Sequence, residues 1–192
     1  MSSILIKSMQ PSDVQTVFLI QTSCYQAAFH ESVAVIAERL GQSPHTAWVA
    51  WMGQHAVGYL VAYPSVLGVP SPLGAGFAVS AQPSCLYIHD LAVAPSAAGC
   101  GVAAQLIEHA LQYARRQGWH SSALVAVQHS QAFWQKYGYQ PYRLDTGQQQ
   151  YLTGYGEGVC YMAQQWTIRP ETVLINSFTD DRNKADDQDS RH

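Results

Sequence analysis

Residues 85–117 read CLYIHDLAVAPSAAGCGVAAQLIEHALQYARRQ and contain three patterns in succession. Cys85–Val93 is rich in large apolar residues and is typical of a buried strand. Pro95–Gly101 is a loop with two glycines, and from about Val102 to Gln117 apolar residues recur at helical spacing. The sequence therefore predicts a strand, a glycine-containing loop and a long amphipathic helix.

The loop has the properties of an anion-binding site. A turn between a strand and a helix exposes backbone N–H groups at the positive end of the helix dipole, which favours phosphate without a basic side chain. Gly99 and Gly101 tolerate positive φ and allow an anion to approach the backbone closely. The same turn could merely join a strand to a helix, so the loop alone does not decide between the two interpretations.

A dinucleotide-binding domain is a second interpretation, because Gly99-x-Gly101-x-x-Ala104 satisfies the relaxed fingerprint of that fold. The fold requires an acidic residue about 20 positions further on to hold the ribose hydroxyls. No acidic residue lies between His109 and Pro141. We therefore disfavour a dinucleotide-binding domain.

Strands and helices alternate along the rest of the chain. The predicted strands are Ile4–Met9, Thr46–Trp51, Ala56–Tyr63, Ala123–Val127, Tyr139–Arg143 and Val159–Trp166. The predicted helices begin near Pro11-Ser12-Asp13, span Ser32–Leu40 with Gly41 as the stop signal, and span Ser130–Tyr137. Pro64–Pro83 contains four prolines and three glycines, so we expect an irregular excursion there. A Gly- and Gln-rich hairpin loop should join the last two strands.

Length and composition limit the class of protein. The chain has 192 residues, of which 47% are apolar and 12% charged, so we expect one folded domain rather than a disordered chain. The formal net charge of −3 gives no basic field for DNA or RNA. We find no apolar run of the ~18 residues that a membrane span needs, and no signal peptide. We assign residues 1–168 to the domain and 169–192 to a polar, acidic tail.

Neither the cysteines nor the histidines have the spacing of a disulfide framework or a metal site. Cys24, Cys85, Cys100 and Cys160 lie far apart, so we interpret them as reduced thiols of a cytoplasmic protein. The eight histidines lack ligand spacing, and we expect no metal.

Three segments together resemble the GNAT superfamily of acyl-CoA-dependent N-acyltransferases. They are Leu91–Val93, Ala98–Ala103 and Ala132-Phe133-Trp134-Gln135-Lys136-Tyr137-Gly138-Tyr139. The resemblance covers the order of elements from about Ile4 to Trp166. It implies an α/β fold with helices on both faces of a mixed, mostly antiparallel sheet of about seven strands, a usual size for a sheet. The fourth and fifth strands should splay apart.

In that family the pantetheine arm of acetyl-CoA fills the splayed gap like an added strand, and the pyrophosphate lies on the glycine loop. The resemblance therefore implies an N-acetyltransferase that uses acetyl-CoA as co-substrate. The implied cofactor residues are Leu91, Ala92, Val93, Ala98, Gly99, Cys100, Gly101, Val102, Ala103, Phe133 and Trp134. The implied acceptor is a primary amine on a small molecule or peptide. The sequence leaves open whether the protein forms a homodimer.

The strongest catalytic candidate is His89, and Tyr87 on the same strand is a further one. Tyr87-Ile88-His89-Asp90-Leu91-Ala92-Val93 resembles the aralkylamine N-acetyltransferase branch, in which two histidines occupy the places of Tyr87 and His89. An imidazole pKa of about 6.5 suits proton transfer near neutrality, although a packed, hydrogen-bonded histidine is an equal alternative. Regular alternation places Tyr87, His89 and Leu91 on one face and Asp90 on the other, unless a bulge intervenes.

Two positions depart from the family pattern. Ala98 replaces the usual Arg or Gln, which removes one contact to phosphate. Trp134 stands where a tyrosine usually protonates the departing thiolate, and an indole N–H cannot act as an acid near neutral pH. Tyr137, one turn further on, is a candidate to replace it, or a packed aromatic at the helix end.

The acceptor site should lie between the first two helices and the last hairpin. Tyr25, Phe29 and Glu31 on one side and Tyr155 on the other suit a small or aromatic amine. Asp90 is a further candidate residue of this site: it either binds the substrate ammonium group or forms a hydrogen bond with loop backbone. Two other classes stay open: an acyl-CoA sensor without catalysis, which the departures at Ala98 and Trp134 favour, and an interaction domain without a CoA site.

Overall fold

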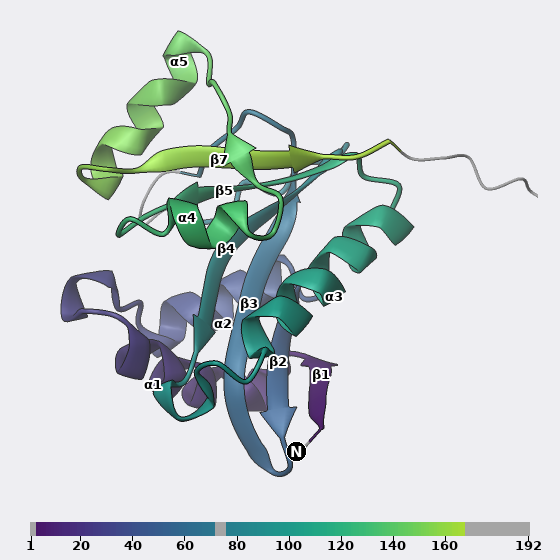
Figure 1. Ribbon diagram of the computed structural model, residues 1–192, viewed down its shortest axis with the longest axis vertical. Helices are drawn as coiled ribbons and strands as arrows, with labels where there is room; N and C mark the ends of the chain where they lie inside the picture. Colours follow the sequence, from purple (N-terminus) through teal and green to yellow (C-terminus); the bar gives the residue numbers. More distant parts are fainter. Residues whose placement is uncertain (1–2, 72–75, 168–192) are drawn as a thin grey trace, which may run out of the picture.

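The computed structural model describes residues 3–71 and 76–167. A seven-stranded sheet runs through the described part of the chain in the order β1-β2-β3-β4-β5-β7-β6 (Figure 1). Its strands are β1 (Ile4–Ser8), β2 (Ala47–Met52), β3 (His55–Ser65), β4 (Cys85–Val93), β5 (Ser121–Ala126), β6 (Gln140–Pro141) and β7 (Cys160–Gln165). Neighbouring strands are antiparallel except β4 and β5, which are parallel. The mixed, mostly antiparallel sheet predicted from the sequence is confirmed.

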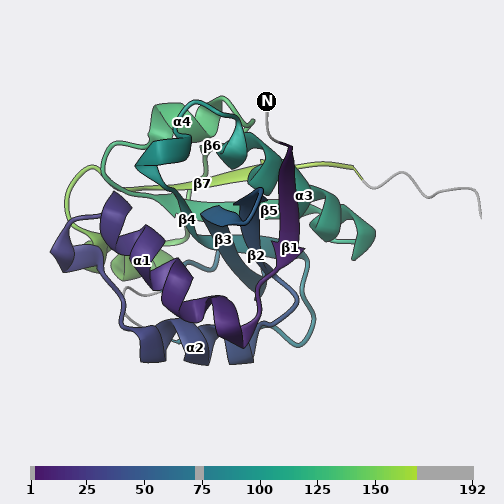
Figure 2. The ribbon, with the colours of Figure 1, turned by 90° about the horizontal axis from the view of Figure 1, so that it is seen from below.

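Helices cover both faces of the sheet (Figure 2). One face carries α1 (Val14–Cys24), which follows the short η1 (Pro11–Asp13), and α2 (Val33–Gln42). The opposite face carries α3 (Val102–Arg116) and α4 (Gln131–Gln135). The remaining helical turns are η2 (Ala27–Phe29), η3 (Pro95–Ala97), α5 (Thr146–Gln149) and η4 (Gln150–Tyr155).

The two faces of the sheet pack two separate cores, as the period of two in a strand requires. On the α3 side, Leu86 and Ile88 of β4 pack with Leu106 of α3. On the α1 and α2 side, Tyr87 of β4 packs in the same cluster as Val17 of α1. Strand β4 contributes to both cores and is therefore held from both sides.

Local signals explain most of the element boundaries. The Ser32 hydroxyl accepts a hydrogen bond from the Val35 N–H (3.3 Å) and begins α2 as an N-cap. Gly118 follows α3 with a φ of 76°, the left-handed conformation typical of a helix end. In contrast, α2 does not stop at Gly41. It continues to Gln42, two residues beyond the predicted last residue, Leu40.

Two further expectations need correction. The predicted strand Tyr139–Arg143 is only the two-residue β6, because its neighbour β7 offers it just two paired positions. The connection between β6 and β7 is not a simple hairpin loop, since it contains the helical turns α5 and η4. Strand β3 extends to Ser65, two residues into the predicted excursion, and the described residues 66–71 and 76–84 after it form no helix or strand, although Phe77 is in the core.

The acidic tail assigned to residues 169–192 lies outside the described residues. Among the described helices, none is both long and apolar enough to cross a membrane. All four cysteines are free thiols, with Cys85 buried and Cys24 and Cys100 exposed.

Candidate active site

Strands β4 and β5 separate partway along their length (Figure 1). They pair only where Cys85–Tyr87 faces Ser121–Ala123, whereas β4 continues to Val93 and β5 to Ala126. The predicted splay between the fourth and fifth strands is therefore present. Beyond Tyr87 and Ala123, no residue pair joins the two strands.

A cavity of about 420 Å³ opens at this separation. Its wall includes residues 87–91 of β4, Leu124 and Val125 of β5, Ala103 of α3, and Phe133 and Trp134 of α4. Tyr25, Phe29, Glu31 and Tyr155 complete it from the α1 and α2 side. The structure thus brings most of the sequence-predicted site residues around one space.

The glycine loop lies between β4 and the start of α3. Gly99 and Gly101 have φ values of 76° and 83°, and α3 begins directly afterwards at Val102. The N–H groups of Ala98 and Cys100 are already used, because they donate to the carbonyls of Pro95 and Ala97 (both 3.2 Å). The amides of the first turn of α3 have no partner within the helix, so they are donors that an anion at this loop could use.

We expect Gly101→Ala to lower the free energy of unfolding by about 1–2 kcal/mol, because alanine is strained in the left-handed region. The added methyl group itself meets open space, so any effect comes from the backbone conformation. Gly147→Ala is the matched control: it lies in α5, its added methyl group also meets open space, and it should be neutral or stabilising. Urea denaturation of both variants checks this expectation, and equal effects would contradict it.

A β-bulge in β4 changes which face the site residues occupy. Val61 of β3 pairs with Asp90 and Ala62 pairs with Ile88, so His89 has no partner in the register. Asp90 therefore joins Tyr87 and His89 on the α1 and α2 side, whereas regular alternation places it on the opposite face. Leu91 correspondingly packs with the core on the α3 side.

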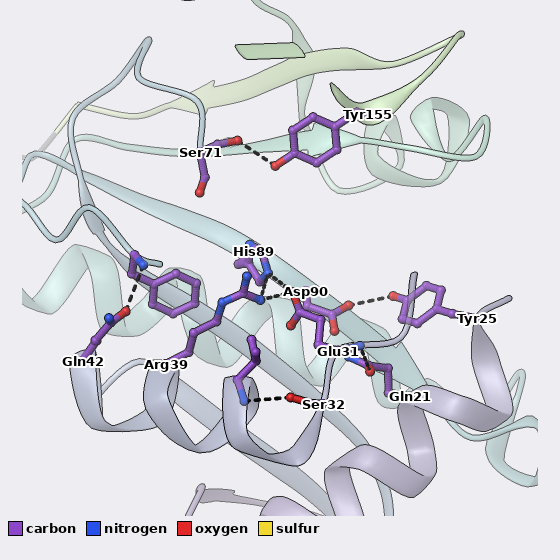
Figure 3. A network of polar contacts seen from close by, with 12 residues as sticks. Gln21, Tyr25, Glu31, Ser32, Arg39, Gln42, Ser71, His89, Asp90 and Tyr155 are labelled. Carbon is purple, nitrogen blue, oxygen red and sulfur yellow. Dashed lines mark hydrogen bonds and ion pairs between the residues drawn. The ribbon is translucent and has the colours of Figure 1, made fainter. Parts of the chain in front are cut away.

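Both oxygens of the Asp90 carboxylate accept hydrogen bonds from tyrosines, and Figure 3 shows the one from Tyr25. Tyr59 of β3 donates to Oδ2 (2.5 Å). The Tyr25 hydroxyl lies 2.8 Å from Asp90 Oδ1 and 2.8 Å from the Leu91 carbonyl oxygen. It has a single proton and donates it to one of these two acceptors at a time. Burial, followed by the nearby Asp90 charge, raises the pKa of Tyr25, so this hydroxyl remains a donor. Asp90 thereby joins α1 to the sheet.

A second cluster consists of His89, Glu31 and Arg39 (Figure 3). Arg39 of α2 is 3% exposed, and its Nη1 contacts both Glu31 Oε1 and His89 Nε2, the latter at 2.6 Å. Its guanidinium also lies over the ring of Phe77, 5.3 Å from the centroid. The same His89 Nε2 also lies 3.4 Å from Glu31 Oε1, so it faces both a donor, Arg39, and an acceptor, Glu31.

The cluster favours an ionised Glu31. Burial alone raises the pKa of this carboxyl, but the hydrogen bond and charge of His89 and the charge of Arg39 outweigh that effect. The pKa of Glu31 is therefore lower than its usual value of 4.5. Glu31 lies on the cavity wall with its side chain 22% exposed, so a negative charge faces the cavity.

The remaining predicted residues divide into two groups. Tyr155 of η4 is on the cavity wall and donates to the Ser71 carbonyl (2.7 Å), and Tyr87 is there with a pKa that burial raises well above its usual value. Tyr137 does not contribute to the cavity wall; its ring packs edge-on against Phe133, with 5.0 Å between centroids. The structure thus separates Tyr137 from the other catalytic candidates.

The carbonyls of β4 in the proposed pantetheine segment already have partners from α1. The Leu91 carbonyl faces the Tyr25 hydroxyl, and the Cys24 thiol lies 3.2 Å from the Val93 carbonyl. A carbonyl oxygen has two lone pairs, so each of these groups can still accept a second hydrogen bond. Within the described residues, no group of His, Cys, Asp or Glu side chains could hold a metal ion.

Sequence reasoning missed Arg39 and Phe77. A lone arginine in an amphipathic helix is normally exposed, and nothing in the sequence near it indicates burial. Phe77 lies in the Pro/Gly-rich excursion, yet its ring stacks on Tyr63 and lies edge-on to His89. Its N–H also donates to Gln42 Oε1 at the end of α2 (2.9 Å), which holds the excursion against the site.

The sequence profile of the acetyltransferase (GNAT) family matches residues 14–139. The chain therefore belongs to the GNAT acetyltransferase family. A comparison with curated proteins finds no matching sequence.

Solved structures share the fold at low sequence identity. GphF, a GNAT-like decarboxylase in complex with isobutyryl-CoA, is 17% identical, with a TM-score of 0.70 over 86% of this chain and 100% of its own. The ribosomal-protein-S18-alanine N-acetyltransferase of Escherichia coli is 16% identical, with a TM-score of 0.64 over 89% and 99%. Arabidopsis thaliana Naa50, in complex with the bisubstrate analogue CoA-Ac-MVNAL, is 16% identical, with a TM-score of 0.61 over 85% and 99%.

Proposed function

We propose that the protein transfers an acetyl group from acetyl-CoA to a primary amine of a small molecule or peptide, within a ternary complex. The observation that carries this proposal is the cavity at the separation of β4 and β5, next to the glycine loop. Membership of the GNAT family supports the acyl-CoA donor. An acyl-CoA sensor with the same fold is the alternative, and no feature of the structure favours it.

The pyrophosphate of CoA would lie on the amides at the start of α3, with Gly99 and Gly101 allowing close approach. The pantetheine arm would run along Leu91–Val93, where β4 has no strand partner on the β5 side. Ala103, Phe133 and Trp134 would enclose the thioester end, since all three contribute to the cavity wall. No basic side chain occurs in residues 94–104, so phosphate binding would depend on backbone donors alone.

The reaction is attack of the amine nitrogen on the thioester carbonyl carbon. A C–N bond forms, the nitrogen gives up a proton, and the C–S bond then breaks to release the CoA thiolate, which takes up a proton. A backbone N–H of Leu91–Val93 would stabilise the oxyanion. The leaving thiol, with a pKa of about 8.5, needs little help, so Trp134 in place of a tyrosine is compatible with turnover.

The walls of the cavity favour a cationic, partly apolar acceptor. Glu31 supplies a negative charge, and the rings of Phe29, Tyr87 and Tyr155 supply apolar surface. No lysine or arginine contributes to the described cavity wall, so an acidic substrate would lack a counter-charge. The resemblance of Tyr87–Val93 to the aralkylamine branch supports the same class of small or aromatic amines.

Amine-dependent thiol release is the direct test. Purified protein with acetyl-CoA should release CoA thiol at a rate that rises and saturates with a small aromatic or alkyl primary amine. The matched carboxylated amines should react more slowly, because Glu31 repels them. Saturable CoA binding without turnover on any amine would instead support the sensor, and no shift in thermal stability with millimolar CoA would exclude both.

A further inference from the structure

We propose that Gln21 is a positioning residue for amine binding: it fixes the backbone at Glu31 and so places the carboxylate that binds the acceptor amine. The role of Glu31 in amine binding rests on the proposed acetyltransferase function. The hydrogen bond between Gln21 and Glu31 is independent of that function and can be measured in the protein alone.

Gln21 is a polar residue on the buried face of α1. It is 2% exposed and lies at helical spacing from the buried Val14 and Val17. A buried amide without hydrogen bonds destabilises a protein, and leucine or methionine would fill a similar volume without that cost. A glutamine at this position therefore requires polar partners inside the protein.

The partner of the Gln21 side chain is the backbone of Glu31 (Figure 3). The Glu31 N–H donates to Gln21 Oε1 at 2.7 Å. Glu31 lies between η2 and α2 and belongs to neither, so its N–H takes no part in a helical hydrogen bond. The next residue, Ser32, is the N-cap of α2. Glu31 is thus held between the Gln21 side chain and the start of α2.

Gln21 also holds the other end of the same connection. Its backbone carbonyl accepts the N–H of Tyr25 at 3.0 Å, the bond that ends α1. The connection from Tyr25 to Glu31 contributes these two residues and Phe29 to the cavity wall. Within it, His30 Nε2 lies 2.7 Å from the Tyr25 carbonyl oxygen. One residue of α1 therefore fixes both ends of the segment that forms this side of the cavity.

The position of the Glu31 backbone matters because its carboxylate has a second oxygen to offer to a ligand. Arg39 Nη1 and His89 Nε2 both contact Oε1, and neither of these contacts uses Oε2. The side chain lies on the cavity wall and is partly exposed. A hydrogen bond from an amine to a carboxylate depends on distance and angle. A displaced Glu31 backbone should therefore weaken amine binding and leave CoA binding intact.

Hydrogen exchange of single backbone amides, followed by NMR, tests the bond without any substrate. The Glu31 N–H should exchange slowly in the wild type and at least about tenfold faster in Gln21→Met, which removes the amide oxygen and keeps a similar side-chain length. The Tyr25 N–H, bonded to the backbone of residue 21, should be unaffected, which shows that α1 is intact. A Glu31 N–H that exchanges freely in the wild type, or equally slowly in the variant, would overturn the inference.

Steady-state kinetics with an amine substrate test the consequence for binding. Gln21→Met should raise the KM for the amine by about tenfold, with kcat and CoA affinity within about twofold of the wild type. Gln15→Met is the matched control, because it makes the same change at an exposed position of the same helix and should alter none of these constants. A wild-type KM in Gln21→Met, or equal losses of amine and CoA binding, would contradict a positioning role.

A cycle of double substitutions shows whether Gln21 acts through Glu31. Glu31→Gln should itself raise the KM for the amine, and Gln21→Met added to it should change the KM by no more than about twofold, because the carboxylate is already gone. A wild-type KM in Glu31→Gln, or effects that multiply, would refute the inference. Absence of turnover with every amine would refute the proposed function and the role in amine binding, whereas hydrogen exchange would still decide whether Gln21 holds Glu31.

Discussion

Replacing Val125 by Trp should reduce CoA affinity by at least about 100-fold, because the larger ring would occupy the gap where β4 and β5 separate. Val125 is on β5 and contributes to the cavity wall beyond the last residue pair that joins the two strands. Val125 is partly buried and packs against the core on the α1 and α2 side, so circular dichroism of the variant should accompany the titration to show that it is folded. Isothermal titration with CoA measures the effect.

Val79→Trp is the control for this substitution. Val79 is 43% exposed in the excursion after β3 and is absent from the cavity wall, so the same change in size should leave CoA affinity as in the wild type. Normal CoA affinity in Val125→Trp would show that the cofactor does not enter between the strands. In that case the proposed acetyl transfer would have no site in this structure.

Replacing Arg39 by Ala should lower the free energy of unfolding by about 3–5 kcal/mol, the cost of removing one partner of a buried ion pair. The guanidinium is 3% exposed and contacts Glu31, His89 and Phe77. Its loss would leave the Glu31 carboxylate without its counter-charge in a largely enclosed position. Urea denaturation at neutral pH measures the difference.

Arg115→Ala is the matched control, because Arg115 also has a carboxylate partner and an aromatic ring but lies at the surface. Its Nη1 is 3.9 Å from Glu108 Oε1, with the two side chains 43% and 57% exposed. Its guanidinium lies 5.0 Å from the Trp166 ring centroid. Exposed pairs contribute at most about 1 kcal/mol, so equal losses in the two variants would contradict the buried role of Arg39.

Acidification gives a second check on Arg39. Because the pKa of Glu31 lies below 4.5 in the fold, the stability that its ionised form contributes is present above that pH and is lost as the pH falls through the folded value. A protonated Glu31 no longer needs a counter-charge. The destabilisation of Arg39→Ala relative to the wild type should therefore shrink in acid.

The strand, loop and helix over residues 85–117 could be predicted because their signals are local. Apolar runs, paired glycines and a helical period occur within single elements, and β4, the glycine loop and α3 lie where these patterns indicate. The family resemblance added the splay, which no local pattern shows. The fold and the position of the glycine loop were thus accessible from the sequence.

The geometry of the polar cluster could not be predicted, because it depends on pairings between distant segments. The bulge at His89 arises from the register between β3 and β4, and one extra residue moved Asp90 to the other face. Arg39 reaches His89 from 50 positions earlier in the chain, and Phe77 reaches both from the described part of an excursion that forms no helix or strand there. Such contacts are fixed only when the whole domain folds.

The short pairing between β4 and β5 also has a mechanical meaning. Three residue pairs join β1–β4 to β5–β7, whereas six pairs join β5 to β7 and eight join β3 to β4. The sheet therefore consists of two well-paired parts, β1–β4 and β5–β7, joined by only a few backbone pairs. A ligand that hydrogen-bonds to β4 and β5 where they are unpaired would join these two parts. Binding in the gap should therefore also make the whole domain more rigid.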